Sequence, residues 1–428
     1  MPNSTANRLA TFVERLLGAP LPIAVRTWDG ERVGPEGPTV VLKNRRARRR
    51  LLYAPGELGL ARAYVSGDLD VEGDLTEGFR RIWALTRSGE LRRVQLAPRD
   101  WAGAVGLAAR LGVLGLPPKP PAEEARLTGV LHSLRRDRSA IAHHYDLSNA
   151  FYQLLLDDSM AYSSGYWTAG NPPAPGYGLA QAQHDKLELI CRKLGLRPGM
   201  RLLDVGCGWG SLLVHAAKHH GVHSVGVTLS AEQVQHVRGR LAQHDLEGRV
   251  EVRQQDYREL TDEPFDAVAS VEMGEHVGEK NYPTYANTLF RMLNPAGRLV
   301  LQQMSRGRAG DTAPGGGAFI ERYIAPDMTM RPLSRTLGHL ETAGFEIRDV
   351  HALREHYVTT VREWAETLEF HWAEAVALVG EAEARVWRLY LVGGALAFEE
   401  NRMGVDQILA VRPTETGGSG LPATREWA

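Results

Sequence analysis

The sequence contains little cysteine and no long apolar run. Cys191 and Cys207 are the two cysteines among 428 residues, which excludes a disulfide framework and indicates a reducing compartment. The N-terminus lacks the apolar segment that signal peptides contain. The longest strongly apolar stretch, residues 389–398, is too short to span a bilayer. These absences predict a cytoplasmic protein without a membrane-spanning helix.

A recognisable metal-binding motif is also missing. His215 and His219 have the i,i+4 spacing of two ligands on one helix face. The glutamate of the His-Glu-x-x-His motif is absent, however, and no carboxylate ligand is near in the sequence. We therefore predict a solvated, histidine-rich helix face and no metal.

Charge is nearly balanced over the chain but unevenly distributed. The net charge is −1, yet residues 1–138 hold 23 Lys and Arg against 15 Asp and Glu, with a dense basic segment at residues 45–50. Such a region indicates an anionic partner, either lipid headgroups or nucleic acid. A merely solvated helix face is the alternative for residues 45–50. The segment lacks the aromatic residues of a single-strand binder, so we predict an anionic membrane surface and no nucleic acid.

The length is sufficient for two or three domains. The proline-rich segment 116–121 cannot form the interior of a helix or a strand and is typical of a linker. We predict a basic N-terminal domain that engages lipid or membrane at 1–115 and a linker at 116–138. A second domain with C-terminal helices follows at 139–413, and a disordered tail at 414–428.

Strand and helix patterns alternate regularly in the second domain. The predicted strands are residues 201–205, 224–228, 250–253, 267–271 and 298–303, with helices between them. This alternation predicts an α/β fold in which a parallel sheet carries helices on both faces. Ligands in such sheets bind beyond the carboxyl ends of the strands. Polar residues follow several of these ends, including Glu272 after the fourth strand.

The first strand ends in a glycine-rich turn. Asp204 is followed by Gly206, Gly208 and Gly210, and an apolar-periodic helix begins at Ser211. Glycine allows a sharp turn from strand to helix and a close approach of the backbone to a ligand. The combination of strand, acid, glycines and helix predicts a nucleoside cofactor.

The spacing of this turn distinguishes between cofactors. A dinucleotide fold would have Gly-x-Gly-x-x-Gly and an acid at the end of the second strand. Here the pattern is Gly-x-Gly-x-Gly, the acid ends the first strand, and no Lys or Arg lies in the loop to balance a pyrophosphate. S-adenosylmethionine is therefore favoured over NAD. We expect Asp204 to face its charged groups and Gln255, Asp256 and Tyr257 to contact the adenine.

At these residues the chain resembles the cyclopropane-fatty-acyl-phospholipid synthase family, whose members alkylate unsaturated lipid chains with S-adenosylmethionine. The resemblance covers nearly the whole chain and rests on residues 144–149, 161–163, 204–210, 226–230, 255–257 and 275–278. It implies a Rossmann-like class I methyltransferase sheet with a smaller N-terminal α+β domain. The cofactor contacts that we predict from the residues and the resemblance together are Tyr162, Ser163, Asp204, Gly206, Gly208, Gly210, Thr228, Ser230, Gln233, Gln255, Asp256 and Tyr257.

The implied reaction transfers a methyl group to a cis double bond and leaves a carbocation on the acyl chain. A base must then accept a proton, and aromatic faces can stabilise the cation. We expect Tyr145, Tyr166 and Trp167 to face the cation.

In ring-forming members the base is a bicarbonate held by a Cys, a Glu, a His and a Tyr. The resemblance places Glu275 and Tyr357 at two of these positions, whereas Ser164 replaces the Cys and Gln302 replaces the His. Gln cannot become cationic and help to hold a carbonate. We predict these four residues to be catalytic, with bicarbonate left open.

The two replacements suggest a branch of the family that forms a methylene group rather than a ring. In that branch a hydride shift precedes proton loss, and a partner reductase converts the product to a 10-methyl chain. Cyclopropane formation on the same phospholipid and methylation of a soluble small molecule remain alternatives. The predicted location is the inner face of the membrane, and a homodimer is left open.

Overall fold

The computed structural model describes residues 4–54, 56–87, 116–145, 148–169, 174–306, 317–425 and 427. Contacts divide the chain into two compact units. Unit 1 comprises residues 1–124 and 380–396, and unit 2 comprises residues 125–379 and 397–428. Within the described residues, no helix is both long and apolar enough to cross a membrane.

Unit 1 is an α+β unit built on a small mixed sheet. Strands β1 (Ala24–Arg26), β2 (Arg32–Val33), β3 (Thr39–Leu42) and β4 (Leu69–Glu72) lie in the order β2-β1-β3-β4. Only β1 and β3 pair in parallel within this sheet. The helices are α1 (Thr5–Leu17), α2 (Arg45–Tyr53), α3 (Glu57–Val65), α4 (Leu75–Arg87) and most of α15 (Glu381–Glu399).

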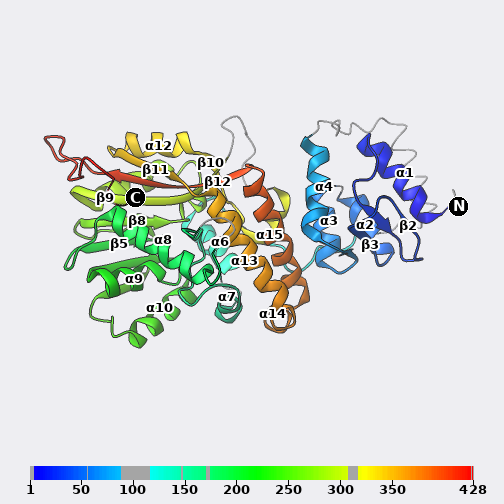
Figure 1. The fold of residues 1–428 in the computed structure, drawn as a ribbon, viewed down its shortest axis with the longest axis horizontal. Coiled ribbons are helices and arrows are strands. Elements are labelled where there is room, and N and C mark those ends of the chain that lie inside the picture. Colours follow the sequence, from blue (N-terminus) through cyan, green and yellow to red (C-terminus); the bar gives the residue numbers. More distant parts are fainter. Residues whose placement is uncertain are drawn as a thin grey trace. The chain divides into compact units, whose positions relative to one another are not determined.

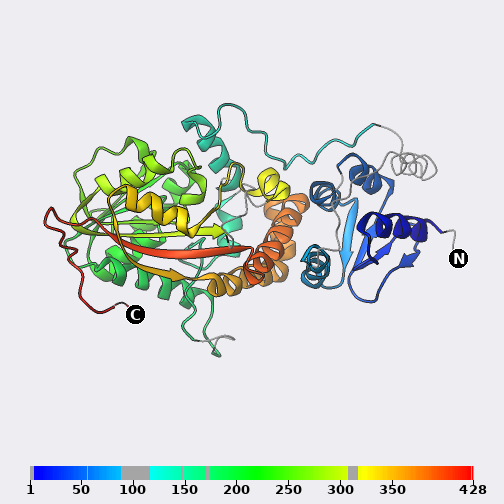
Figure 2. The same cartoon turned by 90° about the horizontal axis from the view of Figure 1, so that it is seen from above.

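Unit 2 is organised around one large sheet. Its strands are β5 (Arg201–Val205), β6 (His223–Thr228), β7 (Val250–Gln254), β8 (Phe265–Val271), β9 (Leu293–Arg306), β10 (Arg331–Pro332), β11 (Glu346–Ala352) and β12 (Met403–Val411). The order is β11-β12-β9-β8-β5-β6-β7, and β10 pairs with β9. The five strands β5, β6, β7, β8 and β9 are parallel to one another. In contrast, β12 is antiparallel to both of its neighbours, β9 and β11. Figure 2 shows β12, in red, extended along this sheet.

Helices cover both faces of the sheet (Figure 1). On one face, α8 (Leu179–Leu194), α9 (Ser211–His220) and α10 (Ala231–Gln243) bury apolar side chains. On the other, α11 (Tyr282–Arg291) and α12 (Leu333–Thr342) enclose a second core. Because helices cover both faces, neither face of the sheet meets water, and the strands carry apolar side chains on both sides.

Shorter elements and the remaining helices complete unit 2. They are α6 (Leu134–Tyr145), α7 (Asn149–Leu155), the short helices η1 (Tyr257–Glu259), η2 (Gly274–His276) and η3 (Ile320–Ile324), α13 (Arg354–Phe370) and α14 (Trp372–Val379). Of these, η1 and η2 directly follow the ends of β7 and β8, where a ligand site is expected.

The predicted α/β architecture and its five parallel strands are confirmed. The strands β11 and β12 were not among the predicted strands, because the sequence analysis expected only helices in the C-terminal part of the second domain. β12 instead lies in the sheet between β9 and β11, and all seven residues from Val405 to Val411 are buried, polar and apolar alike. A strand buried on both faces lacks the period of two by which an isolated strand is recognised.

The contacts group some segments differently from the predicted domains. Residues 380–396 of the C-terminal helices belong with unit 1. In the predicted linker, Glu124 is buried and pairs with Arg62 at 2.6 Å. In the segment predicted as a disordered tail, Trp427 is buried against the α8 and α9 core and Arg425 pairs with Asp349.

Candidate active site

The glycine-rich turn joins β5 to α9 at the carboxyl edge of the sheet. Gly206 and Gly208 have φ angles of 83° and 53°, in the left-handed region that favours glycine. A Cβ on Gly206 would lie 2.7 Å from Cγ of Met273, so the turn packs tightly against the end of β8. A Cβ on Gly208 would meet nothing within 4 Å. The backbone of the turn is therefore accessible where a ligand would lie.

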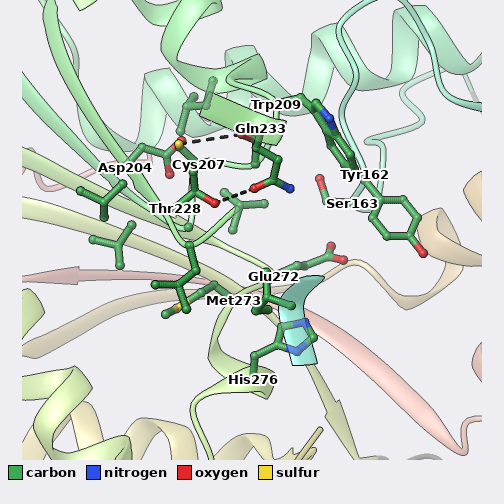
Figure 3. Close-up of a pocket in the computed structure, with 18 of the residues that line it drawn as sticks. Tyr162, Ser163, Asp204, Cys207, Trp209, Thr228, Gln233, Glu272, Met273 and His276 are labelled. Atoms are coloured by element: carbon green, nitrogen blue, oxygen red, sulfur yellow. Dashed lines mark hydrogen bonds between the residues drawn. The ribbon is translucent and has the colours of Figure 1, made fainter. Parts of the chain in front are cut away.

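A pocket opens beside this turn (Figure 3). Its wall includes ten of the twelve predicted cofactor contacts: Tyr162, Ser163, Asp204, Gly206, Gly208, Thr228, Gln233, Gln255, Asp256 and Tyr257. The structure thus brings together residues from five separate segments of the chain. Gly210 and Ser230 lie outside the wall; each stands at the N-terminal cap of a helix, α9 and α10 respectively.

Lys186 of α8 connects two parts of the pocket wall. Its Nζ donates to Oγ of Ser163 at 2.9 Å. Burial lowers the pKa of Lys186 to about 8, and burial raises the pKa of Asp204 to about 7 while Lys186 opposes that rise. Oδ1 of Asp204 is buried without a hydrogen-bond partner among the described residues. A buried oxygen in this state is suited to receive a cationic or N–H donor from a ligand.

The ends of β6 and β7 supply the opposite side of the pocket. The hydroxyl of Thr228 donates to Oε1 of Gln233 at 2.6 Å, as Figure 3 shows. Asp256 caps η1 and holds Arg258 through both carboxylate oxygens. These contacts fix the side chains before any ligand binds.

Glu272, directly after β8, is the centre of a buried hydrogen-bond cluster. Its Oε1 accepts from the backbone N–H of Ser164 at 2.9 Å and from Nε2 of Gln302 at 2.8 Å. Its Oε2 accepts from the hydroxyl of Tyr357 at 2.6 Å. Burial raises the pKa of Glu272, although these three hydrogen bonds and Lys186 favour its charged form. Three of the four predicted catalytic residues therefore surround an acid that was not among them.

The fourth predicted catalytic residue, Glu275, lies behind this centre. It is buried in η2 and is not part of the pocket wall, and its carboxylate has no side-chain hydrogen-bond partner among the described residues. Burial raises the pKa of Glu275 to about 8, and the neighbouring Glu272 raises it further. Of the two acids, Glu272 lines the pocket and Glu275 does not, and the catalytic role of Glu275 stays a prediction.

Two of the three residues expected to face a carbocation, Tyr166 and Trp167, lie outside the pocket wall. The indole N–H of Trp167 donates to Thr360 at 3.0 Å, and Tyr166 packs against His351 and His356. Neither side chain lines the pocket, because these contacts tie the loop to α13. The side chain of Tyr145 lies outside the described residues. The aromatic rings that do line the pocket are Tyr162, Trp209 and Tyr257.

Comparison with known proteins identifies the family. Residues 132–408 match the family model described as mycolic acid cyclopropane synthetase. The chain belongs to this family.

Relatives of this methyltransferase extend the match. This chain is 38% identical to a probable fatty acid methyltransferase of Mycobacterium tuberculosis (strain ATCC 25618 / H37Rv). The alignment spans 416 residues and covers 95% of each chain. The chain is 36% identical over 288 residues to the cyclopropane-fatty-acyl-phospholipid synthase of Escherichia coli (strain K12), which covers 67% of this chain and 71% of that one. The predicted family resemblance is thereby confirmed.

A solved structure supports the fold and the cofactor. A mycolic acid cyclopropane synthase in complex with S-adenosylhomocysteine (SAH) and CTAB matches with a TM-score of 0.59 at 29% identity, covering 64% of this chain and 97% of the other. The Rossmann-like class I fold is confirmed. This protein is an S-adenosylmethionine-dependent enzyme, and the NAD alternative is excluded.

The pocket of this methyltransferase fits its cofactor. The accessible turn at Gly208, the unpartnered Oδ1 of Asp204 and the absence of Lys and Arg from residues 204–210 suit a cationic ligand better than a pyrophosphate. Tyr162, Ser163, Thr228 and Gln233 would hold the nucleoside and amino-acid ends.

Two residues of this site were not predicted from the sequence. Lys186 looks like an ordinary charged residue of a helix, and nothing in its surroundings in the sequence distinguishes it. Glu272 carried one signal, its place directly after a predicted strand. The structure adds that Glu272 has a φ of 51°, a conformation that costs a non-glycine residue about 1–3 kcal/mol and concentrates at functional sites.

The histidine-rich face of α9 is less exposed than predicted. His215 is buried, and its Nε2 and that of His220 lie 3.2 and 3.0 Å from the same oxygen of Glu188 on α8. Sγ of Cys191 and these imidazole nitrogens lie within 4.8 Å of one another. Because Glu188 already accepts from both rings, the cluster is satisfied by hydrogen bonds. The prediction that the chain binds no metal stays a prediction.

The basic segment of α2 is divided between interior and surface. Arg48 is buried with its guanidinium 3.9 Å from the ring centroid of Trp28, and Arg50 pairs with Asp68 at 2.8 Å. Arg45 and Arg46 are exposed. Only part of the segment is therefore available to a partner.

Proposed function

We propose that this methyltransferase acts on the cis double bond of an unsaturated phospholipid acyl chain and forms a methylene-branched chain. When bound, S-adenosylmethionine supplies an electrophilic methyl group. The double bond attacks it, and the positive charge moves to the acyl chain. A pocket wall rich in apolar side chains, including Ile141, Leu187, Val271 and Met273, suits an alkyl chain and excludes water from the cation.

The observation that carries the proposal is the set of residues around Glu272. Where the resemblance implies a Cys and a His in ring-forming relatives, this chain has Ser164 and Gln302, and both contact Glu272. The group that accepts the proton is therefore different. The timing of proton loss decides the product: early loss closes a ring, whereas late loss lets a hydride shift first. The three hydrogen bonds stabilise the charged carboxylate and oppose the rise in the pKa of Glu272 that burial causes, so Glu272 is a weaker base than burial alone would make it, which favours late proton loss.

The full-length relative also supports this assignment. A protein named fatty acid methyltransferase matches 95% of the chain, whereas the cyclopropane synthase of E. coli matches 67%. We propose further that the enzyme works at an anionic membrane surface through Arg45 and Arg46 of α2, and that a separate reductase saturates its product.

Proton NMR of lipids from cells that express the protein tests this function. We expect vinylidene signals of an exocyclic methylene group and their absence from cells that carry an empty vector. High-field cyclopropane signals without vinylidene signals would overturn the methylene product. Unaltered lipids, together with SAH formation on an added soluble acceptor, would instead favour a small-molecule methyltransferase.

A further inference from the structure

The side chain of Glu272 is held in one position on the pocket wall. The left-handed backbone at this residue turns the chain sharply after β8, and its backbone N–H donates to the carbonyl oxygen of Gln302 at 2.6 Å. The side chain is partly exposed and lines the pocket together with Asp204 and Ser163. Figure 3 shows its carboxylate directed into the space between Ser163 and His276.

The three donors to this carboxylate come from three distant segments. They are the backbone of Ser164 in the loop before α8, Gln302 on β9 and Tyr357 on α13. Gln302 is itself oriented, because its side-chain oxygen accepts from Nε2 of Gln407 on β12 at 3.0 Å. Its N–H group must therefore point at Glu272. A carboxylate with three fixed donors is preorganised in its charged form.

These three donors belong to residues at the positions that, by the resemblance, hold the bicarbonate in ring-forming relatives. In this chain Glu272 already occupies the donors at all three positions. A second anion beside this carboxylate would have to compete for the same donors, and the two negative charges would repel one another. The site therefore does not fit bicarbonate.

We propose that the carboxylate of Glu272 replaces bicarbonate and is the general base of the reaction. This proposal rests on the proposed function. After methyl transfer the carbon–sulfur bond is broken, a carbon–carbon bond is formed and the neighbouring acyl carbon is cationic. A hydride shifts to that carbon from the carbon that bears the new methyl group. Glu272 then accepts a proton from the methyl group, the C–H electron pair forms the exocyclic double bond, and the proton leaves from Glu272 to solvent.

The test compares Glu272→Gln and Glu272→Gly with the wild-type enzyme on vesicles of an unsaturated phospholipid, in buffer freed of carbon dioxide. We expect the wild type to keep its full kcat without bicarbonate. Glu272→Gln should lose at least about 100-fold in kcat, the usual contribution of a positioned base, while its affinity for S-adenosylmethionine by calorimetry changes less than about threefold. Glu275→Gln should lose less than tenfold.

Chemical rescue separates a base from a structural residue. Glu272→Gly frees the three donors, so added bicarbonate or formate should restore at least a tenfold increase in kcat, whereas Glu272→Gln should not respond. A wild type that needs bicarbonate, or a Glu272→Gln variant with wild-type kcat, would overturn the proposal. If neither variant nor wild type alters the lipid, the proposed function fails instead, and the two failures are thus distinguishable.

Discussion

Tyr357 controls the acid at the centre of the site through one hydrogen bond. Its hydroxyl lies 2.6 Å from Oε2 of Glu272, and its ring packs on Phe398 and Trp364. The ring contacts hold the hydroxyl in place without depending on it. Removing the oxygen alone therefore changes the electrostatics of Glu272 while leaving the packing of α13 intact.

We expect Tyr357→Phe to lower kcat by about 10–100-fold at neutral pH, because a hydrogen bond to a charged group contributes about 1.5–3 kcal/mol. Loss of this donor raises the pKa of Glu272, so the acidic limb of the kcat profile should move to higher pH. Kinetics between pH 5.5 and 9 measure both effects.

Tyr177→Phe is the matched control. Its hydroxyl also donates to a carboxylate, that of Asp185 at 2.6 Å, but it lies outside the pocket wall. An unchanged acidic limb in Tyr357→Phe would contradict the assignment of Tyr357.

Among the elements, the turn between β5 and α9 packs against the segment that follows β8, beside the pocket. Gly206 is the closest point of this contact, since Met273 leaves no room for a side chain there. The same residue has a φ of 83°, which any other residue adopts only with strain. The geometry of this turn therefore depends on glycine for two separate reasons.

Gly206→Ala should reduce the affinity for S-adenosylmethionine at least tenfold, because either Met273 or the turn must move. Isothermal titration calorimetry measures the effect. Gly199→Ala is the control: Gly199 has a φ of 84°, and a Cβ there meets nothing within 4 Å. It carries the same backbone strain far from the turn. Equal losses in both variants would show that strain alone, and not the contact, accounts for the change.

Helix α2 carries the proposed membrane contact. The double variant Arg45→Gln, Arg46→Gln should bind anionic vesicles roughly 30-fold more weakly, since each basic residue near such a surface contributes about 1 kcal/mol. Co-sedimentation with anionic and neutral vesicles measures this. Arg197→Gln, Arg249→Gln removes the same charge from exposed positions of unit 2 and should bind as the wild type does. Equal weakening by both pairs would refute a specific role of α2.

Two kinds of buried group make the stability of the whole molecule depend on pH. Buried histidines reduce stability as the pH falls, and a buried acid reduces it as the pH rises. Burial lowers the pKa values of His215, His276 and His351 to about 4. The unfolded chain protonates these side chains near pH 6.5, so they reduce stability as the pH falls from 6.5 towards 4. Burial raises the pKa of Glu275 to about 8, so this acid reduces stability as the pH rises to 8. The two effects must be separated by substitution.

His215→Gln isolates one of them. The difference in free energy of unfolding between this variant and the wild type should shift by about 2 kcal/mol in favour of the variant between pH 7.5 and pH 5, at about 1.4 kcal/mol per pH unit below 6.5. Urea unfolding followed by tryptophan fluorescence measures it. A difference that does not change with pH would contradict a neutral, buried His215.

Much of this protein follows from local patterns in the sequence. The strands that form the parallel part of the sheet, the glycine turn and many residues of the pocket wall were predicted, because each depends on neighbouring residues or on the rule that parallel strands share a carboxyl edge. The strand β12 was not predicted, because its burial on both faces removes the alternation that marks a strand.

The centre of the active site was decided by the tertiary structure alone. Ser164, Gln302 and Tyr357 come from segments far apart in the sequence, and only folding shows that all three donate to Glu272. The sequence by itself determined that the protein uses a methyl donor and predicted the glycine turn as its site. Which acid faces it depends on the backbone at Glu272 and on the burial of Glu275, and these are properties of packing that no local pattern contains.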